Sequence, residues 1–386
     1  SYAQTPSLRD SEIAQRGWHA TANQNILPPG YAHFLGADWT TPERHDRITA
    51  LLAEVPVHDM ASMQKVQRDV VSLGALALLP HARQVRTNHT LDAQVRELLA
   101  RFDGRMDRDT AAGMVLNVWA HELTRDLIGS QIGDARFMSI YGKRHLRSAL
   151  LGILERQDAF WCGAQGCALR ASQAMVRTLD RLSKEMGSEP AQWRWGRLHV
   201  AISSHKPFGK VPVLNRLFDE RIESGGDLFT VNVGQYWAND HKEPFANRHA
   251  ASLRAVYDLA DLEQSRFIYQ TGQSGHPASH RSRDMAKPWA EGAYRALRLE
   301  PSEYLHTLIL YRVVENTVLY VGPTLAFALF LLATAAVAEI GYRWVELPGA
   351  RAITAWRNSR SRVASKHELV RRHSGTSVRK IHADRA

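Results

Sequence analysis

The side chains whose types and spacing could carry out chemistry are few, and most of them fail on geometry. His276 and His280 have the i, i+4 spacing of a helical zinc pair, but a proline between them disfavours a continuous helix. Ser274 lies in GQSGH, where the glycines are wrongly placed for the G-x-S-x-G turn that exposes a nucleophilic serine. Asp103 and Asp107 are expected to be solvated charges at helix ends rather than a general acid and base. Local motifs therefore assign no reaction to the chain.

The sequence contains two cysteines, Cys162 and Cys167, in WCGAQGC. Two thiols alone cannot complete a structural zinc site. They could close a small loop by a disulfide in an oxidising compartment, or remain two free thiols in a reducing one. The residues by themselves leave both alternatives open.

The composition is that of a chain that folds around a core, with 44% hydrophobic and 23% charged residues. The net charge of +10 is not spread evenly: from Ile340 to Ala386, 11 Lys and Arg face 3 Asp and Glu. That leaves 38 basic against 36 acidic residues for 1–339. Since the main body has almost no basic excess to neutralise phosphates, we expect no nucleic-acid partner.

Hydrophobic periodicity predicts helices first and strands later, which favours an α+β fold over alternating βαβ units. A threonine, a proline and an acid at 41–43 are typical of a helix start. Further helices are expected over 58–79, 110–128 and 168–186. After Trp193, short β-type runs and Gly-rich turns predict strands.

The C-terminal part differs from both of these regions. Residues 317–338 are 22 consecutive residues without a charge, enough to cross a bilayer at about 1.5 Å per residue. We predict a transmembrane helix here, with a buried core helix as the alternative. The expected regions are a body over 1–299, an apolar membrane segment over 300–346 and a basic, disordered tail over 347–386.

The charges around the apolar run predict its orientation. Eleven Lys and Arg follow it, whereas 301–316 has only Arg312 against Glu303 and Glu315. Because Lys and Arg near membrane helices favour the cytoplasmic side, the body is predicted to lie at the periplasmic face of the inner membrane and the tail in the cytoplasm.

Six longer sequence constellations, taken together, resemble one known family in their order and spacing. The resemblance is to the latter part of the β-subunit of the penicillin acylase family of N-terminal nucleophile amidohydrolases, and it covers about residues 10 to 299. The constellations are ATANQNILPPGY (20–31) with the arginine of PERHDRI (42–48), LLARFDGRMDRD (98–109), WRWGRLHVAISSHKPFG (193–209), SGGDLFTVNVGQY (224–236), SLRAVYDLADLEQS (252–265) and GQSGHPASHRSRDMAKPWAEGAY (272–294).

The resemblance implies an αββα fold and a mechanism. In this family a serine exposed by self-cleavage attacks an amide, and its own α-amino group acts as the base. By the same resemblance, Asn23 supplies an oxyanion-hole donor through its side-chain amide, and Arg44 supports the site. Without the motif, Asn23 would be interpreted as a turn-capping residue. A comparable cysteine pair in the family implies a disulfide between Cys162 and Cys167.

The departures from the family pattern predict an incomplete enzyme. Ser1 precedes Asn23 by only 22 positions and its surroundings do not resemble the start of the family's β-subunit, so Ser1 is not expected to be the nucleophile. The nucleophile, the other oxyanion donor, most calcium ligands and the α-subunit are expected to lie outside this chain. We therefore expect no cofactor here, and expect the α-subunit and the N-terminal β-subunit portion as partners.

The leading hypothesis is an amidohydrolase region acting on N-acyl substrates such as β-lactam antibiotics or acyl-homoserine lactones, inactive on its own. The alternative is a catalytically inactive, membrane-anchored fragment or fusion product. Residues 305–350 also weakly resemble the last membrane helix of integral-membrane acyltransferases, but such an enzyme would need many more apolar spans.

Overall fold

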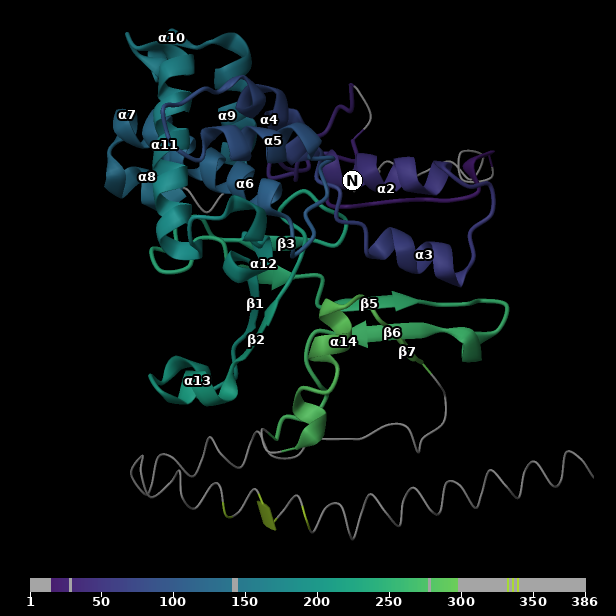
Figure 1. The fold of residues 1–386 in the computed structure, drawn as a ribbon. Helices are drawn as coiled ribbons and strands as arrows, with labels where there is room; N and C mark the ends of the chain where they lie inside the picture. The colour runs from purple at the N-terminus through teal and green to yellow at the C-terminus, as the bar shows by residue number, and fades with distance from the viewer. Residues whose placement is uncertain are drawn as a thin grey trace, which may run out of the picture. The chain divides into compact units, whose positions relative to one another are not determined.

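The computed structural model describes residues 15–27, 30–140, 145–276 and 279–297, with residues 332, 335, 336 and 339. The chain divides into two compact units. The first comprises Ser1–Asp261, Ser265–Thr271 and Met285–Ala296, and the second comprises Leu262–Gln264, Gly272–Asp284 and Leu297–Ala386. Every labelled strand and every labelled α-helix lies in the first unit (Figure 1).

The first four helices are α2 (Glu43–Ala53), α3 (Met60–Gln67), α4 (Leu73–Gln84) and α5 (Asp92–Arg101). Two of them begin at polar side chains that accept hydrogen bonds from free backbone N–H groups. Asp59 and Ser62 form a reciprocal capping box at the start of α3, and Ser72 accepts a hydrogen bond from the Ala75 N–H at the start of α4. Helices α2 and α5 begin without a side-chain cap.

The single helix predicted over 58–79 is wrong, because α3 and α4 are separate helices. Between them, the Asp69 side chain accepts a hydrogen bond from the Val71 N–H at 3.2 Å, and Ser72 caps the next helix. Asp and Ser side chains that bond to nearby backbone compete with helix continuation. The interruption therefore follows from local side-chain chemistry that outweighs the apolar periodicity.

Helix α6 (Ala111–Thr124) is the centre of the first unit. All of its residues except Glu122 are buried, so it is enclosed on every face, as expected of an internal helix. Its main partner is α11 (Gly166–Met186), and the Trp119 Nε1–H donates to the Ala171 carbonyl of α11 at 3.0 Å. Thr110 caps its N-terminus by accepting from the Gly113 N–H.

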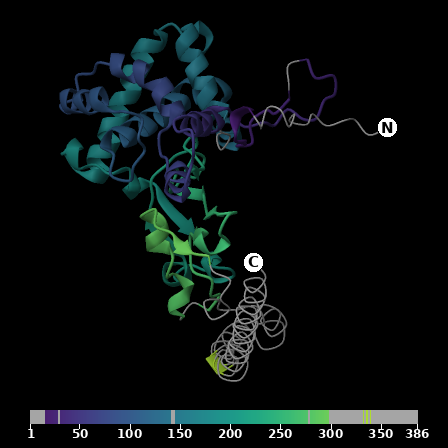
Figure 2. The same cartoon turned by 90° about the vertical axis from the view of Figure 1, so that its right-hand side faces the viewer.

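The other helical elements are short or lie around α6 and α11, and helices α4 to α11 gather together (Figure 1; Figure 2). They are the π-helix Arg125–Gly129, α7 (Ser130–Ile132), α8 (Asp134–Ile140), α9 (His145–Arg156), α10 (Ala159–Cys162), α12 (Trp195–Leu198), α13 (Leu214–Phe218), α14 (Ala286–Ala290) and the 3₁₀ turns Pro190–Gln192, Phe208–Lys210, Leu262–Gln264 and His280–Ser282.

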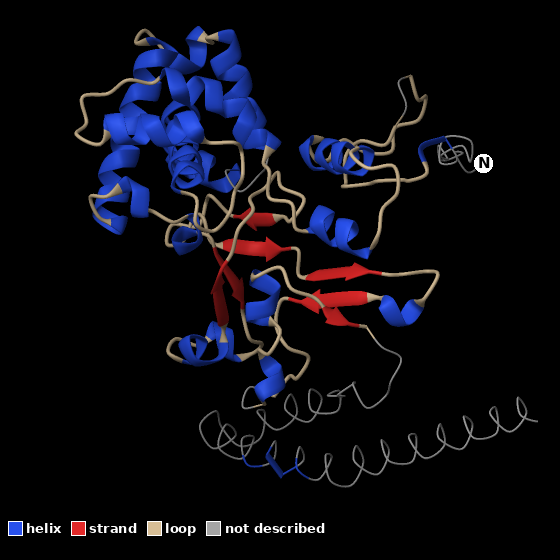
Figure 3. Ribbon diagram, turned by 45° about the vertical axis from the view of Figure 1, so that its right-hand side comes forward, coloured by secondary structure: helices blue, strands red, loops and turns tan. Residues whose placement is uncertain are grey.

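Two small sheets follow the main group of helices in the described sequence, with α13 and α14 lying between strands (Figure 3). In the order β2-β1-β4-β3, only the β1–β4 pair is parallel; in the order β5-β6-β7, both pairs are antiparallel. The strands are β1 (Val200–Ser203), β2 (Glu220–Glu223), β3 (Gly234–Tyr236), β4 (Asn247–Ala250), β5 (Leu253–Val256), β6 (Arg266–Tyr269) and β7 (Arg295–Ala296).

The predicted α+β class is confirmed by this segregation of helices and strands. The buried hydrophobic residues also form two separate clusters. A large cluster surrounds α6, and a smaller one joins Ala201, Ile268, Met285 and Trp289 beside the sheets.

The membrane prediction is wrong. Among the described residues, no helix is long and apolar enough to cross a bilayer. The longest, α11, has 21 residues but carries charges such as Arg177 and Asp180, which would each be costly near a bilayer centre. The predicted placement at the periplasmic face of the inner membrane, anchored by a transmembrane helix, is therefore withdrawn. Apart from positions 332, 335 and 336, the run 317–338 lies outside the described residues.

Candidate active site

Asn23 lies in a tight turn that is tied to the residues just before α2. Its backbone has φ 65°, in the left-handed region that Asn tolerates better than most residues. The Gln24 side chain accepts a hydrogen bond from the Ala22 N–H at 2.8 Å, and the Thr40 N–H donates to the Asn23 carbonyl at 3.0 Å. Gln24 and Thr40 form an isolated bridge, and the described part of 17–40 contains no strand.

Arg44, the second residue of α2, contacts Asn23 directly. Its Nη2 donates to the Asn23 Oδ1 at 2.9 Å and to the Ala22 carbonyl at 2.8 Å. The Thr40 hydroxyl donates to the same carbonyl at 3.0 Å. The fold thus brings together the two residues that the resemblance identifies; their catalytic roles stay predictions.

The contact with Arg44 also sets which atom of the Asn23 carboxamide is available. Because Arg44 occupies the oxygen, the Nδ2 amide is left as the outward donor, and no hydrogen bond within the described chain uses it. Asn23 is exposed. An exposed N–H donor held in a fixed orientation can bind a carbonyl oxygen and stabilise negative charge that develops on it, but it cannot attack a carbon.

Helix α2 is itself braced against the loop before α4. The Arg47 guanidinium makes a two-pronged ion pair with Asp69, at 2.9 Å from Nε and 2.7 Å from Nη2. The Asp69 carboxylate hydrogen bond is the main cause that raises the pKa of Arg47. Because the Asp69 carboxylate is largely buried, the pair is shielded from solvent and fixes the helix that carries Arg44.

Two buried histidines are unsuited to proton transfer at neutral pH. Burial lowers the pKa of His199 to about 4, and its Nδ1 lies 2.8 Å from the Phe245 carbonyl. Burial, together with nearby Arg181, lowers the pKa of His121 to about 3. Both imidazoles are therefore neutral core groups rather than solvent-exposed bases.

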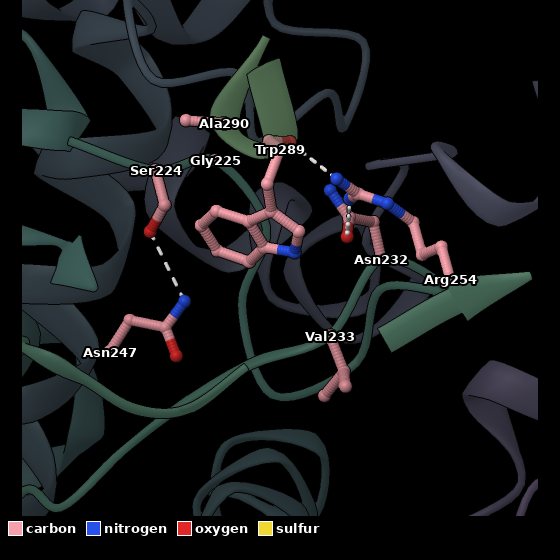
Figure 4. Close-up of a pocket in the computed structure, with 8 residues that line it drawn as sticks. All are labelled: Ser224, Gly225, Asn232, Val233, Asn247, Arg254, Trp289 and Ala290. Atoms are coloured by element: carbon pink, nitrogen blue, oxygen red, sulfur yellow. Dashed lines mark hydrogen bonds between the residues drawn. The ribbon is translucent and has the colours of Figure 1, made fainter. Parts of the chain in front are cut away.

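A small polar cavity lies elsewhere in the first unit and does not include Asn23 or Arg44. Arg254 donates to the Asn232 side chain at 2.9 Å and to the Trp289 carbonyl (Figure 4). Across the cavity the Asn247 amide donates to the Ser224 hydroxyl at 3.1 Å. Its eight lining residues are Ser224, Gly225, Asn232, Val233, Asn247, Arg254, Trp289 and Ala290. Burial lowers the pKa of Arg254 to about 10, but the side chain stays cationic at neutral pH.

Cys162 and Cys167 are joined by a disulfide, with their Cα atoms 4.8 Å apart. The bond links the end of α10 to the start of α11, and both residues are buried in the α6 cluster. The pairing is the one that the family resemblance implies, and it lies within the helical core rather than beside Asn23.

The remaining polar motifs have structural surroundings. Arg105 lies between the two aspartates that could have formed an acid–base pair: its backbone N–H donates to Asp103, and its guanidinium pairs with Asp107 at 2.9 Å. No group of three or more His, Cys, Asp or Glu in the described part of the chain could hold a metal. The family's calcium site remains an expectation about residues beyond this set.

Sequence reasoning missed Thr40, which makes two of the hydrogen bonds that shape the Asn23 turn. A threonine just ahead of the helix-start signature was the only available signal. It also missed the Arg47–Asp69 pair, because nothing in the sequence indicates that residues 22 apart meet.

Comparison with known proteins shows which family the chain resembles. The family model described as penicillin amidase matches residues 1–305. The acyl-homoserine lactone acylase QuiP of Pseudomonas putida is 28% identical over 320 residues, and that of Pseudomonas aeruginosa is 26% identical over 330. The matches cover 75% and 74% of this chain but 38% of each relative.

A penicillin acylase 2 proenzyme from a Pseudomonas strain is 24% identical, over 72% of this chain and 36% of that protein. The chain thus spans well under half the length of the curated relatives it matches. Among solved structures, the thermostable penicillin G acylase from Alcaligenes faecalis has a TM-score of 0.49 at 14% identity, covering 76% of this chain and 57% of that one.

Proposed function

The chain belongs to the penicillin amidase family, and from this premise we propose that it provides the Asn23 oxyanion donor of an N-acyl amide hydrolase. The observation that carries the proposal is the hydrogen bond from Arg44 to the Asn23 Oδ1 at 2.9 Å. It leaves the Nδ2 donor exposed and oriented, as an oxyanion hole requires.

In the proposed reaction the scissile carbonyl oxygen lies against Asn23 Nδ2. When a nucleophile attacks the carbonyl carbon, the oxygen gains negative charge and its hydrogen bond to Nδ2 strengthens. Arg44 acts through Asn23. Its positive charge polarises the carboxamide, and its hydrogen bond to Oδ1 prevents the rotation that would exchange the positions of Oδ1 and Nδ2. A donor fixed before the reaction needs no reorganisation at the transition state, which is the source of its effect on rate.

The nucleophilic serine, in this proposal, belongs to a part of the longer polypeptide that has no counterpart in this sequence. The 38% share of the relatives' length supports this, since a larger part of each relative remains unmatched. The same unmatched part would supply the α-subunit and complete the αββα fold. Ser1 lies outside the described residues.

The proposed substrates are N-acyl amides, with acyl-homoserine lactones ahead of β-lactam side chains. Six acyl-homoserine lactone acylases and one penicillin acylase proenzyme among the curated relatives support this order. Both substrate types carry an acyl group on an amide nitrogen, so one oxyanion donor serves either.

The test compares Asn23→Gly with Asn25→Ala in the enzyme assembled with the rest of its polypeptide. Asn23→Gly keeps the left-handed backbone and removes the Nδ2 donor together with the Oδ1 acceptor of the Arg44 hydrogen bond, so kcat should fall by roughly 10²–10³. Asn25 is exposed two positions further on, and its side chain accepts only the Leu27 N–H within the described chain, so Asn25→Ala should keep full activity. Equal activity of Asn23→Gly and the unsubstituted enzyme would exclude the oxyanion role.

The isolated chain gives a second test. We expect no hydrolysis of a chromogenic acyl amide by the chain alone. Steady hydrolysis that Ser1→Ala abolishes would place the nucleophile in this sequence and contradict the proposal.

A further inference from the structure

Helix α2 carries Arg44 in its first turn, and that end of the helix has no buried apolar side chain. Within α2 the buried residues are Leu51 and Leu52, and both lie in the last turn. At about 1.5 Å per residue, Leu51 lies about 10 Å along the helix axis from Arg44. The helix also begins without a side-chain cap. Burial therefore fixes the far end of α2, and the position of the end beside Asn23 depends on polar contacts.

The ion pair between Arg47 and Asp69 is the contact that restrains this end of the helix. Arg47 follows Arg44 by three residues, so the two side chains lie at neighbouring positions on one helix face. The Nε and Nη2 groups of Arg47 donate to the two carboxylate oxygens of Asp69, at 2.9 and 2.7 Å. Two parallel hydrogen bonds fix the direction of a guanidinium as well as its distance. The pair therefore restrains both the position and the rotation of the first turns of α2.

Asp69 is itself fixed to the rest of the first unit. Its carboxylate also accepts a hydrogen bond from the Val71 N–H at 3.2 Å, and its side chain is 8% exposed. Its carbonyl oxygen accepts from the Asn232 N–H at 2.9 Å. The Asn232 side chain accepts from Arg254, which is buried. Because Asp69 is held through both its side chain and its backbone, it gives α2 a fixed reference position.

We propose that Arg47 and Asp69 are positioning residues for the Asn23 donor. They hold the first turns of α2, so that Arg44 stays against the Asn23 Oδ1 and the Nδ2 N–H keeps its direction. Both act through Arg44 rather than on the substrate. The proposal rests on the proposed function in taking Asn23 as the oxyanion donor. Small displacements of such a donor matter because hydrogen bonds weaken steeply as their geometry departs from the optimum.

The test measures kcat and KM in the enzyme assembled with the rest of its polypeptide. Asp69→Asn keeps the acceptor for the Val71 N–H but replaces the oxygen that faces Arg47 Nη2 by an N–H donor. The matched control is Asp126→Asn, which weakens an ion pair of comparable burial with Arg170, away from α2. In Asp69→Asn, kcat should fall by at least about tenfold with little change in KM, because the donor acts mainly on the transition state. In Asp126→Asn, kcat should not change.

A double-mutant cycle with Asn23→Gly separates positioning from general stability. Once the donor is removed, no group remains for the pair to position, so adding Asp69→Asn should cost less than about a further twofold in kcat. A loss of the same size in both backgrounds would assign the pair to general stability and overturn the proposal. If Asn23→Gly loses activity as expected, an unchanged kcat in Asp69→Asn would overturn it as well.

A second measurement, on the chain alone, does not depend on activity. With isotope-labelled asparagine in heteronuclear NMR, the side-chain amide signal of Asn23 is the one that Asn23→Gly removes. Asp69→Asn should shift this signal, because the hydrogen bond at Oδ1 changes with the position of Arg44. Asp126→Asn also adds one asparagine and should leave the Asn23 signal in place.

The two measurements distinguish the two proposals. An Asn23 signal that is the same in Asp69→Asn and the parent would overturn the positioning role, even if kcat falls. A shifted signal together with full activity of Asn23→Gly would leave the control of the Asn23 side chain standing and count against the proposed function alone.

Discussion

Helix α6 and the turn at Asn23 are held in opposite ways. Nearly every side chain of α6 is buried, and α4, α5, α9, α11 and α12 pack around it. In the Asn23 turn Ala22 is buried, Gln24 is half-buried and Asn23 is exposed, and hydrogen bonds from Thr40 and Arg44 hold the turn. Burial of apolar side chains therefore stabilises the helical core, whereas the candidate site lies where few side chains are buried, as is common for functional loops.

The largest effect should come from Trp119 in the core. Trp119→Ala removes a fully buried indole and its hydrogen bond to Ala171, so the free energy of unfolding should fall by about 3–5 kcal/mol. Urea denaturation followed by circular dichroism measures it.

The matched control is Trp237→Ala, where the indole is 53% exposed. It should change stability by no more than about 0.5 kcal/mol, because solvent already surrounds much of the ring. Similar losses in the two variants would remove the distinction between core and periphery.

The second effect is a pH dependence of the free energy of unfolding, caused by a buried histidine. His199 has a folded pKa of about 4 against an ordinary value of 6.5, because burial excludes the charged form. Above pH 6.5 both the folded and unfolded states hold it neutral, so stability does not depend on its titration. Between pH 6.5 and about 4, His199 is protonated in the unfolded state but stays neutral in the folded state. The free energy of unfolding therefore falls by up to about 1.4 kcal/mol per pH unit as the pH is lowered.

His199→Asn isolates this contribution. Its amide can still donate to the Phe245 carbonyl, which His199 Nδ1 contacts, and it does not titrate. Unfolding midpoints of both proteins across pH 4–7 should show the parent losing stability relative to the variant as pH falls. The comparison cancels the contributions of two other buried groups, because both proteins contain them. His121 lowers stability in the same direction as pH falls, whereas Asp227 acts in the opposite direction because burial raises its pKa. Parallel curves would show that His199 titrates normally.

The third effect concerns the disulfide at the edge of the core. Replacing Cys162 and Cys167 together by alanine opens a loop of sequence separation 5, so stability should fall by about 2 kcal/mol in the chain-entropy account. Dithiothreitol should lower the midpoint of the parent by a similar amount and leave the double variant unchanged. Equal free energies of unfolding for parent and variant would mean that the packing of α10 against α11 stabilises this region without the disulfide.

The same contrast explains what could be predicted from the sequence. Helix α6 was predictable because Leu116, Trp119 and Leu123 recur at helical spacing and all become fully buried. The sheet order β2-β1-β4-β3 was not, because the β1–β4 pairing joins segments far apart in the sequence.

Asn23 and Arg44 were identified by family resemblance rather than by spacing. Their contact depends on how the turn and α2 are placed, which local patterns do not encode. The membrane helix predicted over 317–338 depended on hydropathy alone, and all but three of these positions lie outside the described residues.

The smallest effect should be at Asn23 itself, and it completes the comparison. Asn23→Gly loses one hydrogen bond from Arg44, but glycine adopts φ 65° without strain and the lost side chain was exposed. The free energy of unfolding should therefore change by no more than about 0.5 kcal/mol. Asn23→Ala keeps a Cβ in the left-handed region but loses the polar group that lets Asn tolerate this conformation, so it should be about 1 kcal/mol less stable than the parent. Both variants lack the Nδ2 donor, so both should lose the same activity in the assembled enzyme although their stabilities differ. Urea titration of the two variants, beside their kcat values, separates the turn's backbone from its chemistry. A loss of 3–5 kcal/mol in Asn23→Gly, as expected for Trp119→Ala, would show instead that the turn is part of the cooperative core.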